Sequence, residues 1–151
     1  MPEITEGQPA PAFDMPADGG GRATLSGPTV LYFYPKADTP GCTSEAKDFS
    51  EQADAFAAAG VTVIGVSKDP VKKLDRFKAK YDLKVVLASD EEAGVTETYG
   101  VWVEKSMYGK TYMGIERATF LIDGSGVVRR LWRKVSVKGH AEAVLAAAKE
   151  L

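Results

Sequence analysis

The sequence predicts an α/β fold built on a mixed central β-sheet with helices on both faces. Two observations support this prediction. Between residues 29 and 99, runs of β-branched and aromatic residues alternate with helical patterns, and this order requires parallel strands joined by right-handed crossovers. Near the C-terminus, the tight turn Asp-Gly-Ser-Gly at 123–126 joins two strand-like runs, which requires antiparallel pairing.

Each element is predicted from its local pattern. The run "TVLYFY" at 29–34 has no polar interruption and suits a strand buried on both faces. Asp69 and Pro70 suit the N-cap and first residue of a helix. In order, we expect a hairpin turn at 17–22, strand 29–34, helix 43–59, strand 61–67, a helix from Pro70 that includes Tyr81, strand 85–90, helix 91–99, strands 110–115, 117–123 and 127–134, and helix 139–150. This order of strands and helices is typical of a thioredoxin-like fold.

Composition restricts the class of protein. The 151 residues suit one domain over 1–151, and 44% hydrophobic residues, 26% charged residues and a net charge of −2 give no reason to expect nucleic acid or a membrane as partner. The N-terminus lacks a signal-peptide pattern, and one cysteine allows no intrachain disulfide, so we expect a cytoplasmic protein. One cysteine and one histidine are too few for a structural zinc site, and we expect no metal and no cofactor.

The lone cysteine, Cys42, stands where a helix begins. Thr39 is a candidate N-cap, and Pro40 would be the first helical residue, where its missing N–H costs nothing. Cys42 would then lie in the first turn, where free N–H groups and the helix dipole stabilise a thiolate. Pro40 and Gly41 leave no bulky side chain beside the thiol.

A structural interpretation of Cys42 competes with this one. Cys42 continues the apolar stripe of Ala46, Phe49, Ala53 and Phe56, and such cysteines are usually small buried residues. The order of a buried strand, a Pro-bounded loop and a helix opening with the thiol favours function, because ligand sites in α/β sheets lie at the carboxyl ends of strands.

The string "YFYPKADTPGCTSEAKDF" resembles the active-site loop of peroxiredoxins, in particular the bacterioferritin-comigratory (PrxQ) branch. The segments "VIGVSKD", "SDEE", "YGVW", "MGIERATFLID" and "VKGHAEAVL" extend the resemblance over nearly the whole chain. It implies a thioredoxin fold and an enzyme of the thioredoxin-dependent peroxidase type, which reduces hydrogen peroxide and organic hydroperoxides and serves antioxidant defence.

The resemblance also implies roles for single residues. Cys42 would be the peroxidatic cysteine, Thr39 would supply a hydroxyl, and Arg117 matches the active-site arginine. The Thr39 hydroxyl, the backbone N–H groups near Cys42 and the Arg117 guanidinium would stabilise the negative charge that spreads over the peroxide oxygens during attack by the thiolate. For Arg117, the alternative is a surface ion pair.

Four further residues are predicted around the peroxide. Pro35 and Pro40 would shield the pocket, and Gly41 would leave room beside the thiol. Glu45 lies one turn along the helix from Cys42, where it is either a favourable first-turn carboxylate or a hydrogen-bond partner near the site.

The sequence departs from the family at Lys47, the position where many members of the branch carry a second, resolving cysteine. A sulfenic acid on Cys42 would have no partner within the chain. The resemblance therefore implies a one-cysteine enzyme that depends on an external thiol, such as thioredoxin, glutaredoxin or a small thiol. We expect a monomer.

Two other function classes compete. His140 would be the base of a Cys–His hydrolase, but a surface place in the first turn of the last helix is the simpler interpretation, and no Cys-x-x-Cys pair supports a thiol transferase. A non-catalytic thioredoxin-like binding or chaperone module with a structural cysteine is the third class. Residues 105–114 are either a rim of the pocket or a plain hairpin loop. A tryptophan such as Trp102 is more often a packing residue than a surface on which substrate binds.

Overall fold

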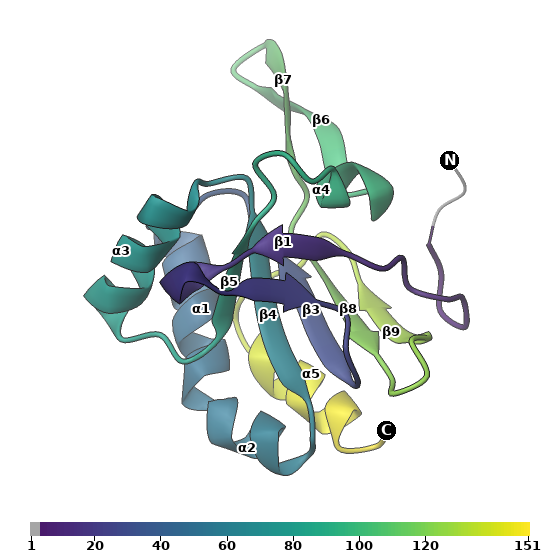
Figure 1. Cartoon of the computed structure of the whole chain (residues 1–151). Helices are drawn as coiled ribbons and strands as arrows, with labels where there is room; N and C mark the ends of the chain where they lie inside the picture. Colours follow the sequence, from purple (N-terminus) through teal and green to yellow (C-terminus); the bar gives the residue numbers. More distant parts are fainter. Residues whose placement is uncertain (1–3) are drawn as a thin grey trace.

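The structure, a computed structural model, describes residues 4–151 and centres on one five-stranded sheet (Figure 1). The strand order is β5-β4-β3-β8-β9. The strands are β3 (Thr29–Phe33), β4 (Thr62–Ser67), β5 (Val86–Ser89), β8 (Ala118–Ile122) and β9 (Val128–Trp132). β3, β4 and β5 run parallel, while β8 pairs antiparallel with both β3 and β9. The predicted mixed sheet is confirmed.

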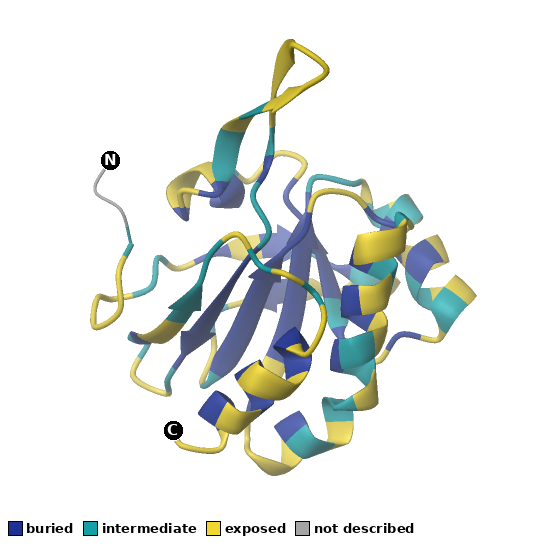
Figure 2. Ribbon diagram, turned by 180° about the vertical axis from the view of Figure 1, so that it is seen from behind, coloured by how far each residue is buried: buried dark blue, intermediate teal, exposed yellow. Residues whose placement is uncertain are grey.

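The two faces of the sheet are covered differently (Figures 1 and 2). One face carries four helices: α1 (Pro40–Glu51), α2 (Ala53–Ala58), α3 (Val71–Tyr81) and α5 (His140–Ala148). The other carries the short helix α4 (Val95–Thr98) and a hairpin of β1 (Asp14–Pro16) and β2 (Arg22–Thr24), which turns through the 3-10 segment η1 (Asp18–Gly20). Helices therefore flank both faces, and the hairpin predicted at 17–22 is present.

Side-chain alternation along β3 divides the core into two clusters. Tyr32 and Tyr34 pack with the four helices, while Leu31 and Phe33 pack with α4 and the β1–β2 hairpin. All four side chains are buried, as expected for a central strand with both faces covered.

The helix expected to start at Pro40 and to continue through the helical pattern at 43–59 is confirmed at its start but is not continuous. It begins at Pro40 and divides into α1 and α2 at Gln52, whose backbone leaves helical geometry (φ −97°, ψ 6°). The Gln52 N–H donates to the Phe49 carbonyl at 3.1 Å, a bond from residue i to residue i−3 that tightens the last turn of α1.

The predicted cap of the next helix is also wrong. Pro70, not Asp69, is the N-cap of α3. The Asp69 carboxylate instead accepts hydrogen bonds from the Ala37 N–H at 2.7 Å and the Ser67 hydroxyl at 2.8 Å. A local cap is thus replaced by contacts that tie β4 to the loop after β3.

Residues 102–115 form a separate two-stranded hairpin, of which the sequence predicts one strand. β7 (Lys110–Ile115) lies where it is expected, and β6 (Trp102–Met107) is absent from the prediction. Outward-facing polar residues in β6 conceal the strand pattern, because neither face of the hairpin tip is covered. The β6–β7 hairpin stands clear of the body (Figures 1 and 2).

Candidate active site

The sheet register brings Cys42 and Arg117 to the same place. Phe33, the last residue of β3, pairs with Ala118, the first residue of β8. Arg117 immediately precedes Ala118, and the loop after β3 leads into α1, which carries Cys42 in its first turn. Two side chains 75 positions apart in sequence therefore meet at the carboxyl end of β3.

Cys42 is buried but has a cationic neighbour. Its side chain belongs to the helix-covered core, and the residue is 2% exposed. Nη2 of Arg117 donates to its Sγ at 3.4 Å. The first intrahelical bond of α1 runs from the Thr43 N–H to the Thr39 carbonyl at 2.8 Å. The N–H groups of Gly41 and Cys42 precede that bond and lie at the positive end of the helix dipole.

Glu45 holds the other side of the guanidinium. Nη1 of Arg117 donates to Oε1 of Glu45 at 2.6 Å, and the Glu45 side chain is only 1% exposed. Burial raises the pKa of Glu45 to about 7, against the opposing charge of Arg117. Burial alone would lower the pKa of Arg117, but the charges of Glu45 and Cys42 outweigh it and raise that pKa, so the guanidinium stays cationic. Of the two interpretations of Glu45, the structure favours the hydrogen-bond partner.

Gly41 makes room for this arrangement. A Cβ atom at position 41 would approach Nη2 of Arg117 to 3.3 Å, which is tighter than ordinary contact. The nitrogen in question is the one that faces Cys42. A larger residue at position 41 would therefore press on the arginine that contacts the thiol.

Thr39 takes the expected backbone conformation but not the expected cap. Its φ and ψ are extended, as for an N-cap, yet its hydroxyl makes no cap bond and donates to the Lys36 carbonyl at 2.8 Å. Pro40 is the first helical residue, as predicted. Pro35 and Pro40 are both exposed, so they border the solvent side of the loop.

The loop between β3 and α1 is tied to the rest of the molecule from two sides. Asp38 adopts a positive φ of 63° and accepts hydrogen bonds from the Tyr81 hydroxyl at 2.7 Å and from Lys80 Nζ at 3.0 Å. Asp69 holds the Ala37 N–H, as described above. The sequence does not reveal how the two aspartates hold this loop, because the contacts that do so join residues at least 32 positions apart.

Buried side-chain oxygens lie in the core near Cys42. The Tyr32 hydroxyl and Oε2 of Glu45 are buried without a hydrogen-bond partner among residues 4–151. Burial, followed by the charges of neighbouring acidic groups that include Glu45 and Cys42, raises the pKa of Tyr32 well above its usual range. Tyr32 is therefore neutral and does not compete with the thiolate for Arg117.

His140 lies apart from this group. The sequence predicts it at the surface, but it is buried, and its Nε2 lies 2.8 Å from the Thr119 hydroxyl. Burial and, second, the charge of Arg117 lower its pKa to about 4. Its ring packs edge-on against Phe49 and Trp132. These contacts give His140 a place in the core rather than a role at the thiol.

The two remaining positions singled out by sequence are exposed or partly buried. Lys47 is exposed on α1, with its Nζ 5.7 Å from the centre of the Tyr81 ring. Trp102 packs against the core at the base of the β6–β7 hairpin, under Lys68 Nζ at 4.6 Å from its ring centre.

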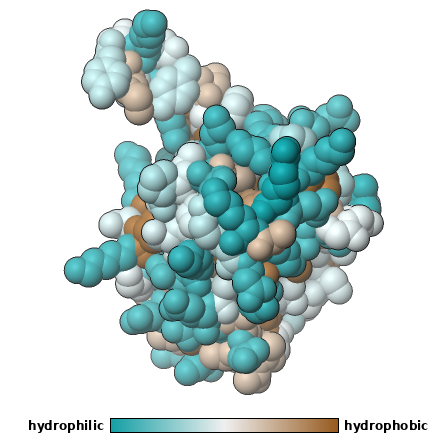
Figure 3. Space-filling view, turned by 90° about the vertical axis from the view of Figure 1, so that its left-hand side faces the viewer, coloured by the Kyte–Doolittle hydropathy of each residue, from teal (hydrophilic) through white to brown (hydrophobic). Residues whose placement is uncertain are grey.

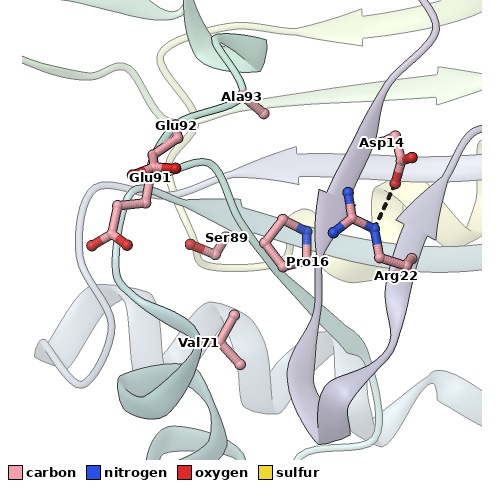
Figure 4. Close-up of a pocket in the computed structure, with 8 residues that line it drawn as sticks. All are labelled: Asp14, Pro16, Arg22, Val71, Ser89, Glu91, Glu92 and Ala93. Atoms are coloured by element: carbon pink, nitrogen blue, oxygen red, sulfur yellow. Dashed lines mark hydrogen bonds and ion pairs between the residues drawn. The ribbon is translucent and has the colours of Figure 1, made fainter.

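A surface pocket near the β1–β2 hairpin shares no residue with this group (Figure 4). It lies between that hairpin, α3 and the segment after β5. The ion pair of Arg22 with Asp14, 2.8 Å long, borders it, and both side chains are largely exposed. A shallow pocket with an exposed ion pair is weaker evidence for a site than a buried thiol with a fixed cation.

Comparison with known proteins agrees with this assignment. Residues 6–131 match the model of the AhpC/TSA family. The chain belongs to that family, in its Bcp/PrxQ branch of peroxiredoxins. It is 49% identical to a putative peroxiredoxin Bcp of Coxiella burnetii, with 94% of this chain and 97% of the relative covered, and 43% identical to peroxiredoxin Bcp of Escherichia coli, with 96% of each covered.

Solved structures of the branch share the fold of this peroxiredoxin. The bacterioferritin comigratory protein of Xanthomonas campestris superposes with a TM-score of 0.86 at 45% identity, covering 91% of this chain and 90% of that one. A cysteine-to-serine mutant of PrxQ from Xylella fastidiosa gives 0.92 at 35% identity, covering 99% and 98%. The predicted thioredoxin-like peroxiredoxin fold is confirmed.

The identification also confirms the predicted enzyme class. As a peroxiredoxin, the protein is a thiol peroxidase, and its one cysteine fits the peroxidatic role. The non-catalytic binding module is not favoured. No helix among residues 4–151 has the length and hydrophobicity needed to cross a bilayer.

Proposed function

We propose that Cys42 of this peroxiredoxin is the nucleophile and that Arg117 and Glu45 prepare it. The observation that supports this most strongly is the position of Arg117, which places one guanidinium nitrogen 3.4 Å from Sγ while the other is fixed by Glu45 at 2.6 Å. An arginine held from behind by a buried carboxylate cannot turn away from the thiol. It therefore offers a preorganised positive charge where the reaction needs one.

In the proposed first step, the Cys42 thiolate attacks one peroxide oxygen, the O–O bond breaks, and the second oxygen leaves as hydroxide or alkoxide, which takes up a proton. The sulfur is oxidised to sulfenic acid by two electrons and the peroxide is reduced. Negative charge moves from sulfur to oxygen during this step, and Arg117 and the N–H groups of Gly41 and Cys42 lie around its path. Because the Thr39 hydrogen is donated to Lys36, Thr39 offers an acceptor lone pair to the peroxide O–H.

In the second step, the sulfenic acid requires a thiol from another molecule, because the chain has no second cysteine. The first molecule of thiol forms a mixed disulfide with Cys42 and releases water, and a second thiol then frees Cys42. We infer hydrogen peroxide and organic hydroperoxides as substrates, and thioredoxin, glutaredoxin or a small thiol as reductant. A monomer in the cytoplasm that protects against peroxides is consistent with a chain whose one thiol cannot form an internal disulfide.

The burial of Cys42 makes local opening of α1 part of the proposal. With Sγ buried and the residue 2% exposed, a second sulfur atom cannot reach it along the line that thiol–disulfide exchange needs. Unwinding of the first turn, at Pro40 to Cys42, would expose the sulfenic acid. This turn is the end of the helix and has few backbone bonds to lose.

The test is peroxide consumption with dithiothreitol as reductant, measured for the wild type and for Cys42→Ser. The proposal predicts that Cys42→Ser consumes peroxide no faster than dithiothreitol alone. Ser44→Ala, an exposed neighbour in the same helix, is the matched control and should keep the wild-type rate. Retention of peroxidase activity by Cys42→Ser would contradict the proposal.

A further inference from the structure

Exposed apolar side chains gather on the β6–β7 hairpin. Among residues 4–151, large hydrophobic side chains are exposed at five positions, and four of these lie on this hairpin: Met107, Tyr108, Tyr112 and Met113. Figure 3 shows the hairpin as a projection from the body, with a few mildly hydrophobic residues among hydrophilic ones. Methionine and tyrosine are enriched at the centres of protein–protein interfaces. Scattered single residues would need no explanation, but this cluster does.

The turn of the hairpin points to a role for its aromatic side chain. Tyr108 and Gly109 both have positive φ, of 52° and 77°, which is the pattern of a type I′ turn. Asn, Asp and Gly are strongly preferred at the first of these positions, while a bulky residue there is strained. Tyr108 is nevertheless there and is 97% exposed, so its side chain buries almost no area against the rest of the chain. The side chain is therefore placed for contact with something outside.

The base of the hairpin is held by hydrogen bonds and adjoins the thiol site. Arg133 Nε pairs with Glu116 at 2.8 Å, and its Nη2 donates to the Gly100 carbonyl at 2.9 Å, so one arginine holds both ends of the hairpin. Arg117, the residue in contact with Cys42, follows two positions after the end of β7. Anything bound along the hairpin is thus held at the same end of the molecule as the sulfenic acid.

We propose that the β6–β7 hairpin is the docking surface for a thioredoxin-type protein, meaning a protein whose exposed reactive thiol is surrounded by apolar surface and followed by a second thiol. This inference rests on the proposed function, because the oxidised Cys42 needs an external thiol. A dithiol protein completes the reaction alone: its first thiol forms the mixed disulfide with Cys42 and releases water, and its second displaces Cys42 while the partner becomes a disulfide.

The hairpin would supply contact area that the buried thiol cannot. A specific complex usually buries about 800 Å² on each partner. Cys42 itself is nearly inaccessible, and the side chains around it are engaged with one another. Met107 and Tyr112 lie on one face of the hairpin, and Met113 lies on the other. Together with Tyr108 at the turn, Met107 and Tyr112 offer an apolar patch that would keep the partner bound until α1 opens. A small thiol such as dithiothreitol gains nothing from this patch.

The test compares two reductants in wild type and Tyr108→Asn. Asparagine suits the positive φ at this position, so the variant should fold at least as well as the wild type. We expect its kcat/KM for reduced thioredoxin to fall by about tenfold or more, as for a central interface residue. The rate with dithiothreitol and the rate of Cys42 oxidation should stay unchanged. Tyr108→Phe should keep the thioredoxin rate, and so should Leu151→Ser, which removes the exposed apolar side chain outside the hairpin.

Three results would overturn the docking surface. The first is an unchanged thioredoxin rate in Tyr108→Asn, and the second is a wild type that gains no rate from thioredoxin over dithiothreitol. The third is a wild-type dimer in sedimentation that Tyr108→Asn dissociates, because the patch would then be covered by a second copy. Each leaves the dithiothreitol reaction intact. Failure of the proposed function looks different, because peroxide consumption would then be absent with every reductant.

Discussion

Arg117 contacts two acidic groups through separate nitrogens, Cys42 at 3.4 Å and Glu45 at 2.6 Å. A guanidinium suits this task because its planar fork presents donors in fixed directions. The sequence identifies Arg117 by its resemblance to a family motif and leaves a surface ion pair as the alternative. The ion pair exists, but it is with Glu45 in the interior and not with the adjacent Glu116, which binds Arg133.

Glu45→Gln should change the pH dependence of stability. The pKa of Glu45 is raised to about 7 by burial, so the native protein keeps a proton that the unfolded chain releases near pH 4.5. The wild type should therefore lose stability as pH rises through that window, by roughly 2 kcal/mol between pH 5 and pH 8. Glu45→Gln carries no titrating group there and should lack this component of the loss.

Urea unfolding at the two pH values measures this effect. Glu51→Gln, which removes an exposed carboxylate from the same helix, is the control and should follow the wild type. If wild type and Glu45→Gln lose the same free energy of unfolding between pH 5 and pH 8, Glu45 does not titrate as described.

At the scale of elements, β3, β4 and α1 form the support beneath Cys42. Gly65 in β4 pairs with Tyr32 in β3, and a Cβ atom at Gly65 would lie 2.6 Å from the Tyr32 ring. Tyr32 in turn stacks on Phe49 of α1, with ring centres 4.6 Å apart. The absence of a side chain at Gly65 therefore leaves space for the Tyr32 ring, and this ring supports α1, the helix that carries Cys42.

Gly65→Ala should destabilise the protein by about 1–3 kcal/mol, as expected for overpacking in a close-packed core. The measurement is urea unfolding. Gly124→Ala is the control, because its added Cβ would meet Pro28 at an ordinary 3.7 Å, and it should change stability little. A Gly65→Ala variant as stable as the control would show that Tyr32 can shift freely.

The sequence predicts most elements, because buried strands and amphipathic helices carry strong local patterns. "TVLYFY" is recognisable as a central strand from its apolar residues alone. The helix predicted to start at Pro70 and to include Tyr81 is α3, which starts one residue later. The sequence does not predict β6, because neither face of this strand is fully buried and its residues therefore do not alternate between apolar and polar. The break at Gln52 and the role of Asp69 depend on tertiary contacts, which local propensity cannot reveal.

At the scale of the whole molecule, the sheet topology creates the site. Placing β8 beside β3 brings Arg117 within 3.4 Å of a thiol 75 positions earlier. The sequence points to Cys42 through its place at a helix start, but it identifies Arg117 only through family resemblance, since spacing along the chain does not tell which segments meet. His140 shows the same limit: the start of a helix suggests exposure, but α5 packs this residue against Phe49 and Trp132.

With the proposed docking surface, the two reactions would be separated in space. Peroxide needs only the small group of donors around Cys42, whereas the reductant needs access and contact area. The β6–β7 hairpin projects from the same end of the sheet and could supply that contact without altering the thiol site (Figure 1). A one-cysteine enzyme depends on such a division, because its second thiol always comes from another molecule.

The most direct test of the central claim is the rate at which hydrogen peroxide oxidises Cys42, followed by rapid mixing and trapping of the sulfenic acid, in wild type and Arg117→Ala. The account predicts that Cys42 in the wild type reacts orders of magnitude faster than free cysteine. Loss of the fixed cation should slow it by about 100-fold or more. Oxidation of wild-type Cys42 no faster than that of free cysteine would contradict the account.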